Sequence, residues 1–527
     1  MSDRAALRLA LSTPLNPMQL RIYNTLSRSI QDFSPIRGAG GEVTFYTCGP
    51  TVYDYAHIGN FRSFLNADVL RRTLELIGHN VVHVMNITDV GHMTDDADAD
   101  GGGEDKMEVA AKRLLEAKKS GTLPEGVDVD PRDPYAIADF YAAAFLEHGR
   151  MLGLKVALDA EEHPERLPRP TQYIPQMVEL VERLIKNSHA YVASDGVVYF
   201  DVSSFPQYGQ LSGNTIDALR EGEGGRVQES HQAVKRSHAD FMLWKPDPSH
   251  LMRWPSPWGE GYPGWHLECS VMAETLLGVN GEIDIHSGGE DNIFPHHECE
   301  IAQSRCAMDA PSFSRYWFHT RHLVVEGAKM SKSAGNFFTV ADILAKGASP
   351  GALRLELVRT HYRQNANFTM QGLRDCQRQI DRWCRLAQRL QEAPEQSSEK
   401  PGPLEQALGP FTEALCDDLN VQRAIGVLNE AVGKHPTDGV PEGDPLREYK
   451  ALEQMDSVLG VLDRAEVPGD SSDSDLDAQV EALIQARNDA RARKDFAAAD
   501  QIRDEISSLG VAIKDGPEGT TWSKIVK

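Results

Sequence analysis

The sequence has no long apolar run. Nowhere in its 527 residues do about 18 apolar residues follow one another, which is roughly what a helix needs to cross a bilayer. We therefore predict no membrane association. The N-terminus, MSDRAALRLALSTPL, has an early Asp3 and too short an apolar stretch for a secretory signal. We expect an N-terminal extension without a role and a cytoplasmic protein.

Cysteine and positive charge are also scarce. Seven cysteines without regular spacing argue against a disulfide scaffold and are typical of the reducing cytoplasm. The chain has 54 Lys and Arg against 78 Asp and Glu, a formal net charge of −24. Net charge governs solubility and steering rather than local contacts, so any surface that binds a polyanion must be a local basic patch on an acidic body.

The length and the remaining composition indicate a soluble protein of several domains. A chain of 527 residues exceeds what one hydrophobic core stabilises, so we expect about three to five domains. A hydrophobic content of 41% with 25% charged residues fits a globular protein.

Residues 43–60, VTFYTCGPTVYDYAHIGN, are the most informative stretch. They predict a β-strand over 43–47, a Gly-Pro turn that carries Cys48, and a helix that opens at His57 and is capped by Gly78. A second buried strand is expected over 81–88, which completes a βαβ unit. Because the first N–H groups of a helix lack internal partners and its dipole favours negative charge, the start of this helix suits a phosphate.

A second motif lies much later, at residues 329–333, KMSKS, followed by AGNF. The two motifs resemble the HIGH and KMSKS signatures of class I aminoacyl-tRNA synthetases. Three more segments are similar to the cysteinyl-tRNA synthetase family: CGPTVY at 48–53, WHLECS at 265–270 and FPHHECEIAQS at 294–304. The resemblance extends from Asn24 to Trp522.

The resemblance implies a Rossmann-type α/β catalytic domain with an α+β insertion, then an α-helical bundle and a small C-terminal α+β domain. The boundaries we expect are 1–168 and 253–322 for the two parts of the catalytic domain, 169–252 for the connective-peptide insertion, 323–369 for the KMSKS loop and stem-contact region, 370–468 for the bundle and 476–527 for the anticodon-binding domain.

Local patterns predict the individual elements. Helices are expected over 108–154 with a break, 173–185, 350–360, 370–390, 404–433 and 446–463, a hairpin over 190–201, and two further strands of the sheet at 283–286 and 323–325. The acidic segment 94–105 is expected to be a flexible loop; a divalent-metal loop is the alternative, but it lacks the spacing of a Ca²⁺ hand. Residues 469–475 read as a linker, followed by two helices and a short strand.

The family resemblance implies one Zn²⁺ per chain, bound by Cys48, Cys269, His296 and Glu300. His296 and Glu300 are four residues apart, so both side chains face one way if a helix begins near Pro295. Two thiolates, an imidazole and a carboxylate suit this ion. The residues alone leave an alternative open, because Cys299 lies on nearly the same face and is a softer ligand than Glu300.

Zinc at this place suits a site that selects cysteine. A thiol coordinated to zinc binds as a thiolate, which the hydroxyl of serine cannot match at neutral pH, so the ion serves recognition rather than hydrolysis. By resemblance, Thr88, Trp265, His286 and Asp291 line the pocket for L-cysteine.

The implied reaction is attack of the cysteine carboxylate on the α-phosphate of ATP, followed by transfer to tRNA(Cys). Both reactants of the first step are anions, so the protein must supply positioning and positive potential. We expect His57, Gly59 and Asn60 to bind ATP, and Lys329 and Lys332 to close over its phosphates together with Mg²⁺. Asn60 stands where the signature has His, so a role that needs an imidazolium there is in doubt.

The C-terminal piece is nearly neutral. Residues 477–527 hold eight Lys or Arg and nine Asp or Glu. By similarity to the family's anticodon-binding end we expect RNA contacts here, made by Arg487, Arg491, Arg493, Lys494 and Trp522. We expect a monomer. Two rival interpretations are a ligase that joins cysteine to a small amine, as in mycothiol synthesis, and a non-catalytic RNA-binding relative.

Overall fold

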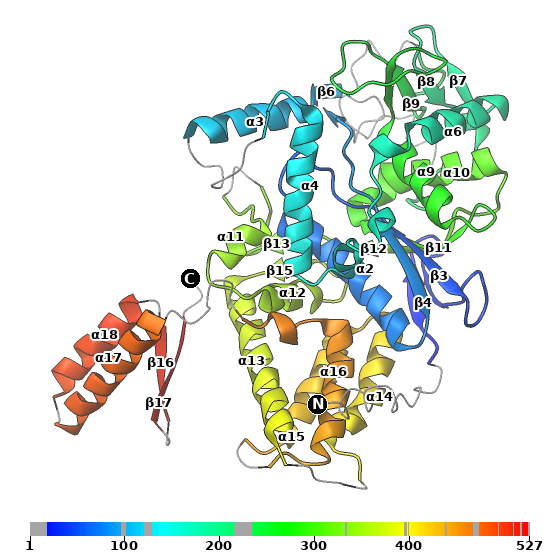
Figure 1. The fold of residues 1–527 in the computed structure, drawn as a ribbon. Coiled ribbons are helices and arrows are strands. Elements are labelled where there is room, and N and C mark those ends of the chain that lie inside the picture. Colours follow the sequence, from blue (N-terminus) through cyan, green and yellow to red (C-terminus); the bar gives the residue numbers. More distant parts are fainter. Residues whose placement is uncertain are drawn as a thin grey trace.

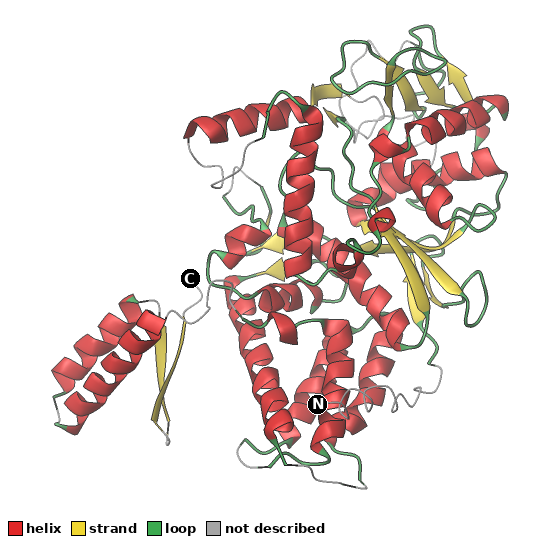
Figure 2. Ribbon diagram, in the orientation of Figure 1, coloured by secondary structure: helices red, strands yellow, loops and turns green. Residues whose placement is uncertain are grey.

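A parallel four-stranded sheet lies at the centre of the computed structural model (Figures 1 and 2). The structure describes residues 18–95, 102–120, 129–214, 234–331, 335–394, 398, 400–437, 440–466, 474–493, 495–509, 511–516 and 519–524. The strand order is β12-β11-β3-β4, with bounds Ser314–Thr320, Ile283–Gly289, Glu42–Thr47 and Asn80–Met85. Strands β3 and β11 are almost wholly buried, as expected for parallel strands covered on both faces.

The first crossover follows the prediction. Helix α2 (Ile58–Leu76) joins β3 to β4, which pair in parallel from Glu42↔Asn80 to Thr47↔Met85. His57 is its N-cap, and Gly78 follows the C-cap Ile77 with φ +96°. Strand β4 ends at Met85, three residues earlier than expected.

The fourth strand of the sheet is β12, which sequence patterns did not reveal. Residues 323–325 do form a strand, β13 (Leu323–Val325), but its assignment to the central sheet was wrong. It pairs with β14 (Ala328–Lys329) and β15 (Ala366–Phe368) in a separate sheet. The reason is that β12 has three consecutive aromatic residues, 316–318, flanked by polar ones, and so shows neither a strict alternation nor a wholly apolar run, whereas β13 is a short apolar run.

The insertion consists of helix α6 (Ile174–Lys186) and an antiparallel sheet of order β10-β9-β8-β7. The strands are Gly261–Pro263, Phe241–Pro246, Val198–Phe200 and Ala190–Val192, and the expected hairpin is β7 with β8. Before the insertion lie α3 (Lys106–Ser120), α4 (Pro134–Met151) and α5 (Lys155–Asp159). The prediction of a loop over 94–105 was wrong at both ends, because β5 (Met93–Asp95) pairs with β6 (Gly102–Asp105). Residues 96–101 lie outside the described part of the chain.

Helices make up most of the chain from α11 to α16, with β15 between α12 and α13. They are α11 (Val340–Leu344), α12 (Pro350–Val358), α13 (Met370–Glu392), α14 (Pro403–Cys416), α15 (Val421–Lys434) and α16 (Pro445–Leu459). The single helix expected over 404–433 is two, because Asp418 and Leu419 adopt left-handed backbone conformations, with φ of 59° and 51°. An N-terminal hairpin, β1 (Arg21–Asn24) with β2 (Ser29–Asp32), contacts β12.

The C-terminal unit has its own small core of Val480, Ile484, Ile506 and Val511. Helices α17 (Ser474–Ala492) and α18 (Phe496–Ser508) pack together, and the expected single strand is a hairpin of β16 (Val511–Gly516) and β17 (Gly519–Lys524). Most of the proposed linker, and the N-terminal extension up to residue 17, lie outside the described residues. Within the described residues, no helix is long and apolar enough to span a bilayer.

Candidate metal and nucleotide site

Four side chains named from the sequence meet at the carboxyl ends of β3 and β11. Cys48 directly follows β3, Cys269 lies on α9 (Trp265–Leu277), and His296 and Glu300 lie around the start of α10 (Glu298–Met308). Their ligand atoms all lie within 4.8 Å of one another, and all four residues are buried. The two sulfurs are 3.6 Å apart, and His296 Nε2 is 3.0 Å from Glu300 Oε1.

This is the switch point of the sheet. From β3 the chain continues through α2 to β4 on one side, and from β11 through α10 to β12 on the other. Adjacent strands whose connections leave in opposite directions open a crevice at their carboxyl ends, which is where ligands bind in such sheets. The sequence therefore brings Cys48 and Glu300 together because they follow neighbouring strands.

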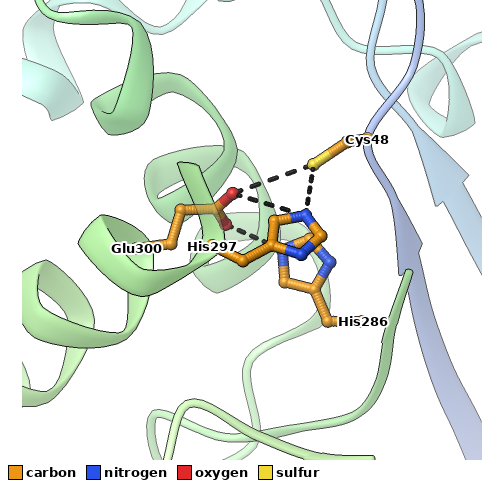
Figure 3. Close-up of side chains that lie close together, drawn as sticks. All are labelled: Cys48, His286, His297 and Glu300. Atoms are coloured by element: carbon orange, nitrogen blue, oxygen red, sulfur yellow. Dashed lines mark hydrogen bonds and ion pairs between the residues drawn. The ribbon is translucent and has the colours of Figure 1, made fainter. Parts of the chain in front are cut away.

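A second, overlapping set shares two of these residues. Cys48 and Glu300 also lie within 4.8 Å of His286 and His297, as Figure 3 shows. Cys48 Sγ is 3.2 Å from His297 Nε2, and Glu300 Oε2 is 2.7 Å from His286 Nε2. Because Cys48 and Glu300 belong to both sets, a single ion would be bound by one set or by the other.

The charges in the cluster are strongly coupled. Burial disfavours the charged form of Glu300, but the imidazoles of His286 and His296 outweigh it and lower the pKa of this carboxyl to about 2. Burial likewise opposes the charge on His296, yet Glu300 raises the pKa of this imidazole to about 10. For Cys269, burial is outweighed by hydrogen bonds from Cys48 and His296, which lower the pKa of the thiol to about 7.

An outer layer of rings holds the ligands. Trp265 stacks on His296 with ring centroids 4.2 Å apart, and His266 Nδ1 is 2.9 Å from His296 Nδ1. Behind His297, His319 Nε2 lies 2.8 Å from its Nδ1, and His319 in turn contacts Thr25. Such outer partners fix the orientation of metal-binding imidazoles.

The alternative ligand Cys299 points elsewhere. Its sulfur is 3.3 Å from the hydroxyl of Tyr208, in the core between α10 and the insertion, and it belongs to neither cluster. Burial raises its pKa well above the usual value for a thiol. The geometry thus places Glu300, and not Cys299, with Cys48, Cys269 and His296.

The donor set fits zinc. Two sulfurs, one imidazole nitrogen and one carboxylate oxygen at mutual distances below 4.8 Å are the number and kinds of donors that a tetrahedral Zn²⁺ takes. The buried hydroxyl of Tyr46 also faces the cluster, and the nearby Cys269, Cys48 and Glu300 add to burial in raising its pKa. A hydroxyl kept protonated there can donate to a thiolate.

The first signature forms a capping box. The backbone N–H of Asn60 donates to His57 Nδ1 at 3.1 Å, and the N–H of His57 donates to Asn60 Oδ1 at 3.1 Å. Because Nδ1 accepts a hydrogen bond, the neutral ring carries its proton on Nε2. The oxygen of Asn60 therefore caps the helix, and the proton of the His57 ring is on Nε2.

The two signatures touch each other. A Cβ on Gly59 would lie 2.7 Å from Met330 Cε and 2.9 Å from two ring atoms of His57, so side chains of both signatures lie against this glycine. The N–H of Ile58 donates to Phe338 O at 3.0 Å, and His57 forms a β-bridge with Thr339. The segment that follows the lysine motif is thus bonded to the start of α2.

Lys329 is exposed at the end of β14. Asn336 holds the ends of the motif together: its Nδ2 donates to Lys329 O at 3.1 Å, and its Oδ1 accepts from the N–H of Ser331 at 2.9 Å. Lys332 lies outside the described residues.

The residues expected to line the cysteine pocket differ in position. Trp265 and His286 contact the cluster directly, as described. Thr88 is buried, and its hydroxyl donates to Glu268 Oε2 at 3.0 Å. Asp291 is exposed in the turn Glu290–Asn292 that follows β11. The structure therefore brings two of the four against the ligand set.

The basic residues expected to contact RNA differ in their exposure to solvent. Arg491 and Arg493 are exposed on the C-terminal unit, whereas Arg487 is buried. Trp522 lies on β17 opposite Ile513, and Lys494 is outside the described residues.

Sequence reasoning missed His297, His319 and Asn336. The second histidine of the HHxxE group was the available signal for His297, but spacing alone does not choose between two adjacent histidines. His319 lies on β12, the strand that was itself missed.

Comparisons with known proteins agree with this geometry. Residues 36–378 match the family described as tRNA synthetases class I (C) catalytic domain, and residues 473–522 match the Cysteinyl-tRNA ligase anticodon binding domain. The Cysteine–tRNA ligase of Salinibacter ruber is 40% identical over 96% of this chain and 98% of its own length. The Cysteine–tRNA ligase of Chlorobaculum tepidum is 42% identical over 96% of this chain and 99% of its own length.

The fold has a counterpart among solved structures. The LeuRS of Agrobacterium radiobacter, solved in a ternary complex with tRNA and LeuAMS, aligns with a TM-score of 0.53 at 12% identity, over 82% of this chain and 85% of that one. At this identity the likeness concerns the fold alone. The predicted family is confirmed by the matching domains and near full-length relatives: the chain belongs to the cysteinyl-tRNA synthetase family of class I aminoacyl-tRNA synthetases.

Proposed function

We propose that this chain joins L-cysteine to tRNA(Cys). It activates cysteine with ATP to cysteinyl-adenylate, releases pyrophosphate, and transfers the cysteinyl group to the terminal ribose of the tRNA. The observation that carries the proposal is the convergence of Cys48, Cys269, His296 and Glu300 at the switch point of the sheet. Cys48 also lies in the chain segment that leads to His57 and the start of α2.

Zinc is the ion that we propose for this cluster, one per chain. When bound, it supplies a Lewis-acid centre at which a thiol is held as a thiolate, so that cysteine is selected over serine. Cys48, Cys269, His296 and Glu300 would hold it. This set has two sulfurs, whereas the overlapping set with His286 and His297 has one, and zinc favours the softer donors.

The residues around the cluster would then orient the amino acid. His286 fixes the second oxygen of Glu300, which leaves the first oxygen toward the ligand set. Trp265 covers His296 and forms a wall beside it. We propose Thr88 and Asp291 as further contacts of the substrate.

The nucleotide would lie at the start of α2. We propose His57 Nε2–H and the backbone of Gly59 as contacts of phosphate oxygens, because the N–H groups of Ile58 and Asn60 are bonded to Phe338 O and His57 Nδ1. Lys329 and Lys332, with Mg²⁺, would neutralise the charge that develops as the cysteine carboxylate attacks the α-phosphate. Asn60 acts here by capping the helix and holding the tautomer of His57.

The remaining assignments are also proposals. The domain boundaries given above, a monomeric state and a cytoplasmic location complete the proposed function. All seven cysteines are free thiols, which supports a reducing compartment. The C-terminal unit would bind the anticodon through its exposed arginines.

A cysteine-dependent ATP–pyrophosphate exchange assay tests the proposal, followed by charging of tRNA(Cys). We expect exchange with cysteine and not with serine, charging of tRNA but not of an aminosugar, and one zinc per chain. Transfer of the cysteinyl group to the aminosugar in place of tRNA would contradict the proposed acceptor.

The choice between the two overlapping sets needs a matched pair of variants. His296→Gln and His297→Gln change adjacent buried histidines in the same way. We expect His296→Gln to lose zinc and His297→Gln to retain it. The opposite result would assign the ion to the set with His286 and His297.

A further inference from the structure

A buried carboxylate lies beside the ligand set without belonging to it. Glu268 is on the first turn of α9, between Trp265 and Cys269, and is fully buried. It is in neither of the two groups of four residues that could hold a metal ion. A buried carboxylate is costly unless it is hydrogen-bonded, so its partners indicate what it does.

One oxygen of Glu268 is bonded to Thr88. The hydroxyl of Thr88 donates to Glu268 Oε2 at 3.0 Å and accepts from Asn86 Nδ2 at 2.9 Å. The amide of Asn86 is oriented at its other end, because its Oδ1 accepts from the N–H of Gly49 at 2.9 Å. The sulfur of Cys269 is 3.7 Å from the same oxygen. Hydrogen bonds therefore connect the carboxylate, through the hydroxyl of Thr88, to the edge of the ligand set.

The other oxygen of Glu268 is bonded to His92. Nε2 of His92 contacts Oε1 of Glu268, and both side chains are buried. The N–H of Lys106 donates to His92 O at 2.9 Å, next to the paired strands β5 and β6. A Cβ on Gly91 would lie 2.9 Å from Asp105 Oδ1, so the two ends of this hairpin are in close contact. The paired strands of the acidic segment thus hold His92 against Glu268.

These hydrogen bonds fix what the hydroxyl of Thr88 can still bind. A hydroxyl has one proton and two lone pairs. In Thr88 the proton goes to Glu268, and one lone pair takes a proton of Asn86. An ionised carboxylate only accepts, so Glu268 keeps the proton of Thr88 turned toward itself. Any further partner of the Thr88 oxygen therefore has to be a donor.

L-Cysteine offers one group of this kind besides its thiol. The thiol belongs to the ligand set in the proposed function, and the carboxylate of the amino acid only accepts hydrogen bonds. The ammonium group is a donor, and the negative charge of Glu268 behind the hydroxyl favours a cation at that place. With the ammonium at Thr88 and the thiol at the ligand set, the carboxylate is the group left to face the nucleotide.

We propose that Glu268, held by His92, is a positioning residue that fixes the hydroxyl of Thr88 as an acceptor for the ammonium group of L-cysteine. This inference rests on the proposed function and assigns the orientation of its amino-acid substrate. Glu268 acts through Thr88 and does not touch the reacting atoms.

The test is Glu268→Gln in the zinc-loaded protein, with dissociation constants measured by calorimetry for three thiols. Cysteamine has the thiol and the ammonium group of cysteine, and 3-mercaptopropionate has the thiol and the carboxylate. The glutamine amide lacks the charge and can donate to Thr88. We therefore expect cysteine and cysteamine to bind roughly 10- to 100-fold more weakly. Binding of 3-mercaptopropionate should change less than about threefold, and zinc should stay at one per chain.

Glu448→Gln is the matched control. Glu448 is also a fully buried carboxylate beside a buried imidazole, with His435 Nε2 at 3.0 Å, but it lies on α16 in the bundle. This variant should change each dissociation constant less than about twofold.

A second pair of variants keeps the test open if Glu268→Gln does not fold. Thr88→Val has nearly the shape of the parent side chain but no hydroxyl, and it should weaken cysteine and cysteamine in the same way. Thr88→Ser keeps the hydroxyl and should bind all three thiols within about threefold of the parent protein.

The pattern across the three thiols separates the possible causes. Equal weakening of all three, or loss of zinc in Glu268→Gln, would overturn the inference, because Glu268 would then act on the ligand set. Unchanged binding of cysteamine in Thr88→Val would also overturn it. Each of these results leaves the proposed function standing. Failure of the parent protein to exchange pyrophosphate with cysteine would overturn the proposed function itself, and the inference with it.

Discussion

Replacing one sulfur of the ligand set is the sharpest test of the cysteine site. In Cys269→Ser a hydroxyl stands 3.6 Å from the sulfur of Cys48, in a cluster with no other soft donor besides Cys48. The thiol of Cys269 has its pKa lowered to about 7, so it ionises readily, whereas a serine hydroxyl does not. The variant should therefore bind zinc far more weakly.

The magnitude follows from the ligand count. Loss of an outer partner of a metal ligand already costs about 10- to 100-fold in metal affinity, so loss of one of four direct ligands should cost at least about 100-fold. We expect KM for cysteine to rise by at least about 100-fold, equivalent to about 2.7 kcal/mol. KM for ATP should change less than about threefold, because His57 and the start of α2 keep their own hydrogen bonds.

Cys299→Ser is the matched control. Cys299 is as buried as Cys269 and belongs to the same core cluster, but its sulfur contacts Tyr208. This variant should keep one zinc per chain and a KM for cysteine within about twofold of the parent. Metal analysis and exchange kinetics measure both quantities. Full zinc content in Cys269→Ser, or equal rises of KM for cysteine and ATP, would refute the reasoning.

Three further outcomes are expected. Asp68→Asn should lower the free energy of unfolding by about 3 to 5 kcal/mol in urea titrations, because it leaves the fully buried Arg354 without its carboxylate at 2.6 Å. Gly59→Ala should slow exchange about tenfold with little change in Tm, because the added Cβ would lie 2.9 Å from Cε1 and Nδ1 of His57 and would displace that ring. Burial lowers the pKa of His83 to about 3. Below the usual histidine pKa of about 6.5, the unfolded chain therefore binds a proton that the folded chain does not. The free energy of unfolding should fall as the pH drops from about 6.5. His83→Gln should reduce that slope by about 1.4 kcal/mol per pH unit, measured by urea unfolding at several pH values; an unchanged slope would refute this reasoning.

Local chemistry explains what the sequence could predict. The strand that ends at Thr47 and the helix that opens at His57 have clear patterns, and a helix start is a local property of the chain. The predicted set of Cys48, Cys269, His296 and Glu300 came from resemblance, and the switch-point topology brings those four residues together.

Other features depend on contacts that no local pattern records. Strand β12 has three consecutive aromatic residues between polar ones, and its place in the sheet is set by parallel pairing with β11. The break between α14 and α15 depends on Asp418, whose carboxylate accepts hydrogen bonds from the N–H of Tyr23 and the hydroxyl of Tyr362. These partners are distant in sequence, so an uninterrupted helix was the natural expectation.

The buried side chain of Arg62 connects the two signature segments. Arg62, on the second turn of α2, is fully buried, and burial lowers its pKa to about 10, so it remains charged at neutral pH. Its guanidinium donates to the backbone carbonyls of Arg321, Leu357 and Gln364, at 3.2, 2.6 and 3.0 Å. Among the described residues its recorded hydrogen bonds all go to carbonyls.

Arg321 and Gln364 lie just before β13 and β15, two strands of the sheet that carries Lys329, and Leu357 lies near the end of α12. One side chain thus ties the helix that starts beside His57 to the sheet that carries the lysine motif. Asn336 fixes the far end of the motif to Lys329 O and to the N–H of Ser331. The described residues on both sides of the lysine motif are thus held at the end of β14, beside the start of α2.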